Sequence, residues 1–220
     1  MKTTFEWLKY VDNFDEVLNK FNFNFDDNGF YLIQLMIRKK DINKTKFEWL
    51  VKWDNLQLKE FYITSKEDLL AKRELIVYLC NSTWARAYIT PRRYHFENVS
   101  FEFIRNIGEQ FSNRNFSSMK NKYISSIIKS KSLNKKRIID IDNSDKNSFE
   151  YNYFNLYLKN NKIEFFELHT PHWFHLICEP FNLQIFNKEI SKIENIINKE
   201  RIQEVSIHKN NSTILYSLVF

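Results

Sequence analysis

Between Arg137 and Ile207 the chain alternates short apolar runs with segments of helical spacing, and this rhythm limits the folds that it can adopt. The apolar runs predict four strands, over Arg137–Asp142, Lys162–His169, Phe174–Cys178 and Ile202–Ile207. Two helices are expected between them, over Phe149–Leu158 and Asn187–Glu200. The predicted order is β-α-β-β-α-β, which is typical of one antiparallel sheet with helices on one face.

This order is the one found in ferredoxin-like and RNA-recognition-motif (RRM) domains. Earlier in the chain, three strands predict a β-meander, and Ser65–Asp68 resembles a capping box that begins a helix. The expected fold class is therefore α+β, an N-terminal β-meander plus helices packed on a C-terminal RRM-like antiparallel sheet core. The meander strands are Phe30–Ile37, Phe47–Trp53 and Gln57–Ile63. The remaining expected elements are helices over Phe5–Asn19, Glu97–Phe111 and around Tyr123–Ile128, and strands over Ala85–Ile89 and Thr213–Phe220.

We expect two lobes that pack as one compact unit, an N-terminal α+β lobe over residues 1–136 and an RRM-like core over residues 137–220. The N-terminus lacks the apolar stretch of a signal peptide, and no apolar run approaches the ~18 residues of a membrane span. These features predict a cytoplasmic protein without membrane contact. The two cysteines, Cys80 and Cys178, are too few for a disulfide framework and are expected to be buried thiols.

Charge alone says little about partners. The chain has 33 basic and 27 acidic residues, which gives a net charge of +6. Asn, Lys, Ile and Phe are abundant and Gly is scarce, a bias that AT-rich coding produces. Many of the lysines are explained by this bias, so the charge surplus is weak support for a polyanionic partner.

Asp140 and Asp142 are the clearest chemical signal. Residues i and i+2 of a strand point to the same face, so both carboxylates would converge. Two like charges on a buried face need a compensating cation, and Mg²⁺ or Mn²⁺ prefers such hard oxygen ligands. The alternative is an Asp pair at a strand end, with one carboxylate capping a turn and the other in water. Glu204, on the last strand of the motif, is a candidate third carboxylate.

Three of the five histidines, His169, His172 and His175, lie within seven residues. Their spacing allows a zinc site, but no HExxH motif or cysteine partner accompanies them. A histidine that contacts a phosphate or a nucleotide is the other interpretation, and His175 is favoured because it lies opposite the strand of the acids. An ordinary hairpin is the third.

Arginines gather around a predicted strand and its end, at Arg86, Arg92 and Arg93. Guanidinium groups bind phosphates bidentately, so this segment is a candidate phosphate-binding edge. Surface arginines that cover apolar area are the alternative.

Together these motifs resemble the archaeo-eukaryotic primase (primase-polymerase) superfamily, in a phage or bacterial form. The resemblance rests on Ile139–Asp142, Thr170–His175 and Glu204, extended by Ala85–Ile89 and by Ile207–Tyr216. It implies metal binding and catalysis by Asp140, Asp142 and Glu204, and nucleotide binding by His175, Arg86, Arg92, Arg93 and Lys209. Two positions depart from the family pattern: Trp173 stands where a small residue is usual, and Glu204 stands where an Asp is usual.

The resemblance implies a metal-dependent nucleotidyltransferase that uses Mg²⁺ or Mn²⁺, nucleoside triphosphates and a single-stranded or primed nucleic acid. Two other functions are compatible with the same residues. One is a non-catalytic nucleic-acid-binding or inhibitory protein on a degenerate primase-like fold. The other is a metal-dependent nuclease, in which the carboxylates would activate water.

Overall fold

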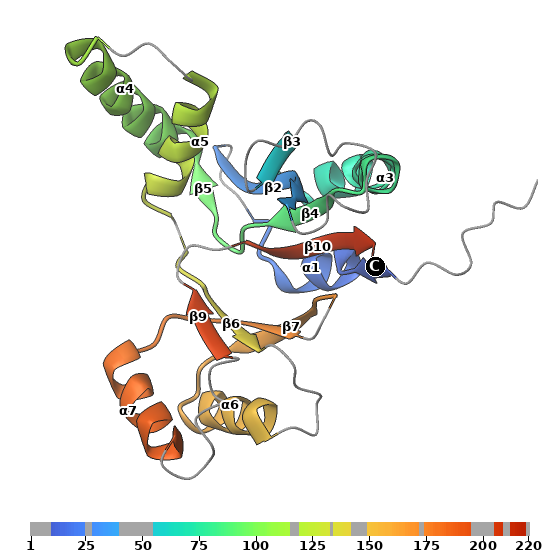
Figure 1. The fold of residues 1–220 in the computed structure, drawn as a ribbon, viewed down its shortest axis with the longest axis vertical. Coiled ribbons are helices and arrows are strands. Elements are labelled where there is room, and N and C mark those ends of the chain that lie inside the picture. Colours follow the sequence, from blue (N-terminus) through green and yellow to red (C-terminus); the bar gives the residue numbers. More distant parts are fainter. Residues whose placement is uncertain are drawn as a thin grey trace, which may run out of the picture.

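The computed structural model describes residues 10–24, 28–39, 55–114, 119–132, 134–141, 149–171, 174–194, 205–208 and 212–218 (Figure 1). These residues form two antiparallel sheets and six helices, so the predicted α+β class is confirmed. None of the helices in these ranges combines the length and the apolar character needed to cross a membrane.

The first sheet has six strands. Five of them lie in the order β1 (Tyr10–Asp12), β10 (Thr213–Leu218), β4 (Arg86–Ile89), β2 (Gly29–Arg38) and β3 (Asn55–Ile63). The short β5 (Tyr94–His95) pairs with the start of β2. Strands β4 and β10 extend the sheet on the side of β2 away from β3, so the sheet is not a simple meander. The predicted strand Phe47–Trp53 lies outside the described residues.

Four helices accompany this sheet: α1 (Phe14–Lys20), α3 (Lys66–Thr83), α4 (Phe96–Ser112) and α5 (Met119–Lys129). The buried faces of α1 and α3 share one core with alternate residues of β2 and β4. The helices α4 and α5 lie against each other and project from one end of the molecule (Figure 1). A smaller cluster around Phe30, Tyr94 and Ile127 anchors them to the sheet.

The second sheet is built from the segments in which the β-α-β-β-α-β order was predicted. The elements are β6 (Arg137–Ile141), α6 (Phe149–Asn160), β7 (Phe165–His169), β8 (Phe174–Cys178), α7 (Leu183–Glu194) and β9 (Val205–His208). The strand order is β7-β8-β6-β9, with every neighbouring pair antiparallel. Both helices lie on one side of this sheet, and the first sheet lies on the other (Figure 1).

Alternation along β6 determines which residues face which layer. Ile139 and Ile141 pack in the cluster of α6 and α7, together with Phe154 and Phe186. Ile138 packs instead in the core shared with the first sheet. The helix-free face of the second sheet is therefore covered by the first lobe.

The last strand is an exception to the expected division at residue 137. Strand β10 was expected in the C-terminal lobe, but it lies in the first sheet between β1 and β4. All six of its residues are buried, so both faces of the sheet are covered at this strand.

Two predicted helix boundaries were wrong. The helix expected over Phe5–Asn19 begins at Phe14, because Tyr10–Asp12 pairs with β10 and the Asp12 carboxylate accepts a hydrogen bond from Phe14 N. Residues 1–9 lie outside the described residues. The helix expected from Asn187 begins at Leu183, because the Asn182 side chain accepts hydrogen bonds from the two amides that follow Leu183.

A buried asparagine joins the two sheets. Asn13 is fully buried, and its Nδ2 donates to the carbonyls of His169 at 2.8 Å and Ile214 at 2.7 Å. Its Oδ1 accepts a hydrogen bond from His169 N at 3.1 Å. Asn13 precedes α1 but does not cap it with its side chain, because these three bonds use the amide. The end of β7 is thereby fixed to β10.

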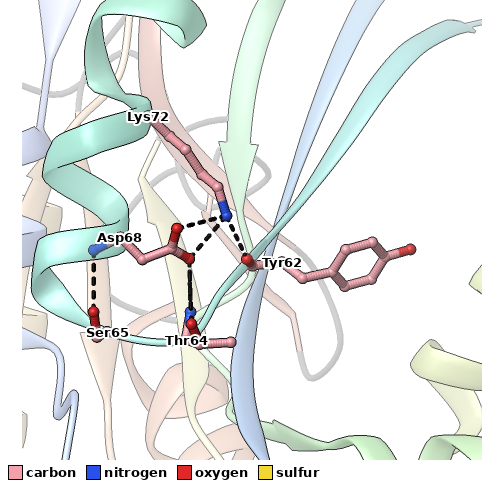
Figure 2. Close-up of polar contacts among 5 residues, drawn as sticks. All are labelled: Tyr62, Thr64, Ser65, Asp68 and Lys72. Atoms are coloured by element: carbon pink, nitrogen blue, oxygen red, sulfur yellow. Dashed lines mark hydrogen bonds and ion pairs between the residues drawn. The ribbon is translucent and has the colours of Figure 1, made fainter.

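The predicted Ser65 cap at the start of α3 is confirmed, while the reciprocal bond of Asp68 goes to Thr64 N and not to Ser65 N (Figure 2). Ser65 Oγ accepts a hydrogen bond from Asp68 N at 3.0 Å. The Asp68 carboxylate accepts from Thr64 N at 3.0 Å and forms an ion pair with Lys72 at 2.7 Å. Lys72 also donates to the carbonyl of Tyr62, so the helix is tied to the end of β3.

We predict that Ser65→Ala lowers the free energy of unfolding by about 1 kcal/mol, because Asp68 N loses its capping acceptor. Urea denaturation measures the change. The matched control is Ser100→Ala, an exposed position inside α4, which should shift stability by less than about 0.5 kcal/mol. Equal effects of the two substitutions would contradict the role of the cap.

We predict a larger loss for Asn13→Ala, about 2–4 kcal/mol, because the substitution removes three hydrogen bonds and leaves buried backbone groups without partners. The measurement is again urea denaturation. Asn19→Ala, an exposed position on α1, is the control and should be near neutral. A near-neutral Asn13→Ala would show that the junction between the sheets does not depend on this amide.

Candidate functional site

Asp140 lies on β6, between β8 and β9 in the second sheet. Its backbone is in register with His175 on β8 and with Ser206 on β9. Asp140 and His175 therefore occupy one cross-strand pair, with side chains on the same face. Asp142, Glu204 and Lys209, which were also predicted for the site, lie outside the described residues.

Asp140 and His175 contact each other directly. His175 Nε2 lies 3.1 Å from Asp140 Oδ1, and the two side chains are 12% and 24% exposed. The pair is thus largely buried but still reaches solvent. Alternation places it on the face that looks toward the first sheet, next to Ile138 and Ile177.

A third residue completes the chain of contacts. His175 Nδ1 lies 2.8 Å from Thr213 Oγ1, and Thr213 is fully buried at the start of β10. An ionised carboxylate only accepts hydrogen bonds, so the Asp140 contact places a proton on Nε2. In the neutral ring Nδ1 then accepts from the Thr213 hydroxyl, and in the charged ring it donates to that oxygen. The series of contacts Asp140–His175–Thr213 therefore includes residues from both sheets.

The histidine cluster does not gather around one cation. Leu168 is opposite His175 in the β7–β8 register, so the neighbouring His169 points to the other face of the sheet. His169 is exposed, and its backbone bonds to Asn13. His172 and Trp173 lie outside the described residues. A zinc site that uses both His169 and His175 is therefore excluded by this geometry.

The arginines lie away from this pair. Ala87 and Ile89 of β4 face the core shared with the second sheet, so Arg86 points to the opposite face of the first sheet. Arg86 is 5% exposed, and it is not brought to Asp140. Arg93 lies in the turn after β4, where its guanidinium donates to the carbonyl of Asn24. Burial lowers the pKa of Arg92, the residue before Arg93.

A cavity of about 200 Å³ opens between the lobes, and an adjoining one measures about 420 Å³. Lys20, Lys136 and Phe166 line both of them. Tyr31 is part of the smaller cavity, and burial raises the pKa of its hydroxyl to about 12, so the group stays protonated at neutral pH. The acids Glu164 and Glu179 also line this region, and Glu179 forms an ion pair with Lys136.

The cavities and the Asp140–His175 pair lie at opposite ends of the space between the sheets. Lys136 is four residues before Asp140, which corresponds to roughly 13 Å along a strand. The buried side chains of Ile138 and Ile177 lie between them. The two regions are separate along β6, and Ile177 forms part of the wall of the smaller cavity.

The cysteines behave as predicted. Both are buried, and burial raises the pKa of each thiol to about 12. Neither forms a reactive thiolate at neutral pH. Within the described ranges, no group of three or more His, Cys, Asp or Glu side chains forms a cation site.

Sequence reasoning predicted that Asp140 and His175 face each other but missed Thr213 and Asn13. That prediction followed from the expected β-α-β-β-α-β order, which sets the strand of His175 beside the strand of Asp140, and from side-chain alternation in each strand. Thr213 reaches His175 only because β10 joins the other sheet, which no local pattern indicates.

Comparisons with protein-family models, curated proteins and solved structures give no match.

The contact between Thr213 and His175 is testable by a double-mutant cycle. We predict a coupling free energy of about 1 kcal/mol between Thr213→Val and His175→Phe, because each substitution leaves the partner's polar atom without its bond. Urea denaturation of the two single variants and the double variant gives this value. The cycle of Thr90→Val with His175→Phe is the control, since Thr90 bonds to Leu32 instead. Additive effects in the Thr213 cycle would contradict the contact.

Proposed function

We propose that the chain is a metal-dependent nucleotidyltransferase of the primase-polymerase type, with Asp140 and His175 at its reacting centre. The observation that carries the proposal is their direct contact on adjacent strands, 3.1 Å apart and partly open to solvent. A carboxylate beside an imidazole is a common pairing for cation and phosphate chemistry.

The strand arrangement supports an RRM-like core for this enzyme. The sheet order β7-β8-β6-β9, with helices after β6 and β8, supports this proposal because a split β-α-β unit is expected to have that order. In the resembling family, the first strand of such a core carries the acids and the hairpin carries the histidine. Asp140 on β6 and His175 on β8 occupy these two strands.

The donors at this site fit a divalent cation in part. The Asp140 carboxylate is a hard oxygen donor and is 24% exposed, so a cation can reach it. The resemblance adds Asp142 and Glu204 as further ligands. A bound Mg²⁺ or Mn²⁺ would stabilise negative charge on a transferring phosphoryl group.

His175 has a separate role in this proposal. Because Nδ1 contacts Thr213 Oγ1, Nε2 is the nitrogen directed toward Asp140. We propose that a phosphate oxygen of a nucleoside triphosphate replaces the Asp140 carboxylate as the acceptor of this Nε2–H. The basic turn with Arg92 and Arg93 lies away from the pair and is proposed to bind phosphates of a single-stranded template, while Lys209 is proposed to bind phosphates of the nucleotide or the template.

One observation favours the non-catalytic alternative. The imidazole of His175 already contacts the Asp140 carboxylate, and a charged ring would compensate that carboxylate without any cation. A nucleic-acid-binding protein that does not turn over would be consistent with such a pair. Activity and cation binding separate the two functions.

We predict that Asp140→Asn abolishes nucleotide incorporation in Mn²⁺ or Mg²⁺, a fall of at least about 100-fold, because the amide is a much weaker cation ligand. Primer extension with labelled nucleotides on a single-stranded template measures it. His175→Ala should chiefly raise KM for the nucleotide, because it removes a phosphate contact.

The control is Glu164→Gln, which removes an exposed acid just before β7 and should leave incorporation unchanged. Isothermal titration with Mn²⁺ provides a second readout, in which Asp140→Asn should weaken binding and Glu164→Gln should not. Equal background incorporation by the wild type and Asp140→Asn would overturn the enzymatic proposal. Binding of single-stranded DNA by that inactive wild type would support the non-catalytic function.

A further inference from the structure

The smaller cavity between the lobes has an aromatic wall. It lies where the end of α1 meets strands of both sheets, and Phe21, Tyr31 and Phe166 form one cluster of rings along it. Phe21 packs edge-to-face on Tyr31, with 4.9 Å between the ring centroids, and on Phe166, with 5.8 Å. Pro91 and Ile177 extend the apolar wall. A flat apolar ring that enters the cavity would add to an existing aromatic cluster.

The polar groups of this wall bond to the protein itself. The Tyr31 hydroxyl donates to the carbonyl of Asn22 at 3.1 Å, and Asn134 Oδ1 accepts from Arg93 N at 2.6 Å. Because burial raises the pKa of Tyr31 to about 12, its hydroxyl adds no negative charge at neutral pH. The charge of a ligand is therefore selected by the lysines and acids of the cavity.

These charged groups leave one cation without an acid. Lys136 forms an ion pair with Glu179 at the wall of the smaller cavity. Lys20, in the last turn of α1, forms no ion pair or side-chain hydrogen bond within the described ranges. One unpaired ammonium group beside an apolar wall favours a ligand with a single negative charge. A second negative charge would be repelled by Glu179, or by Glu164 in the larger cavity.

The volume of the smaller cavity limits the ligand to one ring. Its 200 Å³ lies below the roughly 300–1,000 Å³ of sites for drug-sized ligands. An apolar cavity of about 150 Å³ holds one benzene molecule. The smaller cavity is therefore large enough for a six-membered ring that carries a carboxylate, and too small for a ligand of several rings.

We propose that the smaller cavity binds a small aromatic monocarboxylate, with its ring on Phe21 and Phe166 and its carboxylate paired with Lys20. The ring of the ligand would extend the aromatic cluster, and the carboxylate would supply the acid that Lys20 lacks. The site is separate from the Asp140–His175 pair, so this proposal does not rest on the proposed function. Because residues of both lobes line the cavity, the ligand would also stabilise the junction between them.

Titration of the full chain with benzoate, followed by amide ¹H–¹⁵N NMR, tests the proposal. Benzoate should shift the signals of Phe21, Phe166 and Ile177 in one saturable transition. It should also raise the melting temperature, as a ligand of the folded state does. Benzamide has the same ring without the charge, and it should bind at least about tenfold more weakly, because it loses the charge-assisted bond to Lys20.

Two pairs of variants test the two parts of the site. Lys20→Met should weaken benzoate binding about tenfold, because methionine keeps an unbranched chain and removes the charge. Lys159→Met is its matched control, because Lys159 is exposed in the last turn of α6. Phe166→Leu should weaken benzoate about threefold or more, because the ligand loses an aromatic contact. Phe23→Leu is the control for that ring, since Phe23 packs on Tyr31 but is not part of the cavity wall.

A wild type whose amide signals do not respond to benzoate would overturn the proposal, as would equal affinities of the wild type and Lys20→Met. Equal binding of benzoate and benzamide would overturn the recognition of charge. If AMP bound at the same amides more tightly than benzoate and lost this binding in Lys20→Met, the cavity would be a nucleotide site instead. No arm of the experiment measures nucleotide incorporation, so the cavity and the proposed function succeed or fail separately.

Discussion

The hydrogen bonds of one buried amide, Asn13, determine how the two sheets meet. A side chain with both a donor and an acceptor can satisfy backbone groups of two strands from different sheets at once, and Asn13 bonds to His169 on β7 and to Ile214 on β10. An aliphatic residue at this position would leave those groups buried without partners. The amide also fixes the position of β10 relative to the hairpin of β7 and β8. Thr213 begins β10 and His175 lies on β8, so their contact follows from the same junction.

The sequence predicted most elements of the fold because the signals are local. The run Phe30–Ile37 and the alternation in Arg137–Asp142 gave strands close to their observed bounds, and Ser65 gave the start of a helix. The pairing of Asp140 with His175 was also predictable, since the β-α-β-β-α-β order sets β8 beside β6 and side-chain alternation determines the face. The position of β10 in the first sheet was not predictable. A buried strand has the same pattern in either sheet, and its neighbours are chosen by tertiary packing.

The space between the sheets is divided by its apolar middle. Ile138 and Ile177 are buried there, with the Asp140–His175 pair at one end and the cavity of Lys20 and Lys136 at the other. Burial of the isoleucines keeps the sheets in contact, so a ligand at one end does not extend to the other without separating them. Charge balance differs between the ends as well. Each cavity is lined by Lys20, Lys136 and one acid, Glu179 in the smaller and Glu164 in the larger, and the ion pair of Lys136 with Glu179 reduces the positive charge that could bind a polyanion.

Helix α4 shows why burial cannot be read from apolar spacing alone. The helix was predicted from its periodicity, yet apolar residues occur on two faces, and the sequence does not say which face turns inward. The face that turns inward is the one whose polar side chain has a hydrogen-bond partner inside the protein. Asn106 finds the hydroxyl of Ser126 on α5, while Val99 and Phe103 contact the core and Tyr123. Because that face is turned inward, Phe101 and Ile104 lie on the outer side of the helix and stay 65% and 67% exposed, so apolar spacing predicted the helix but not its buried face.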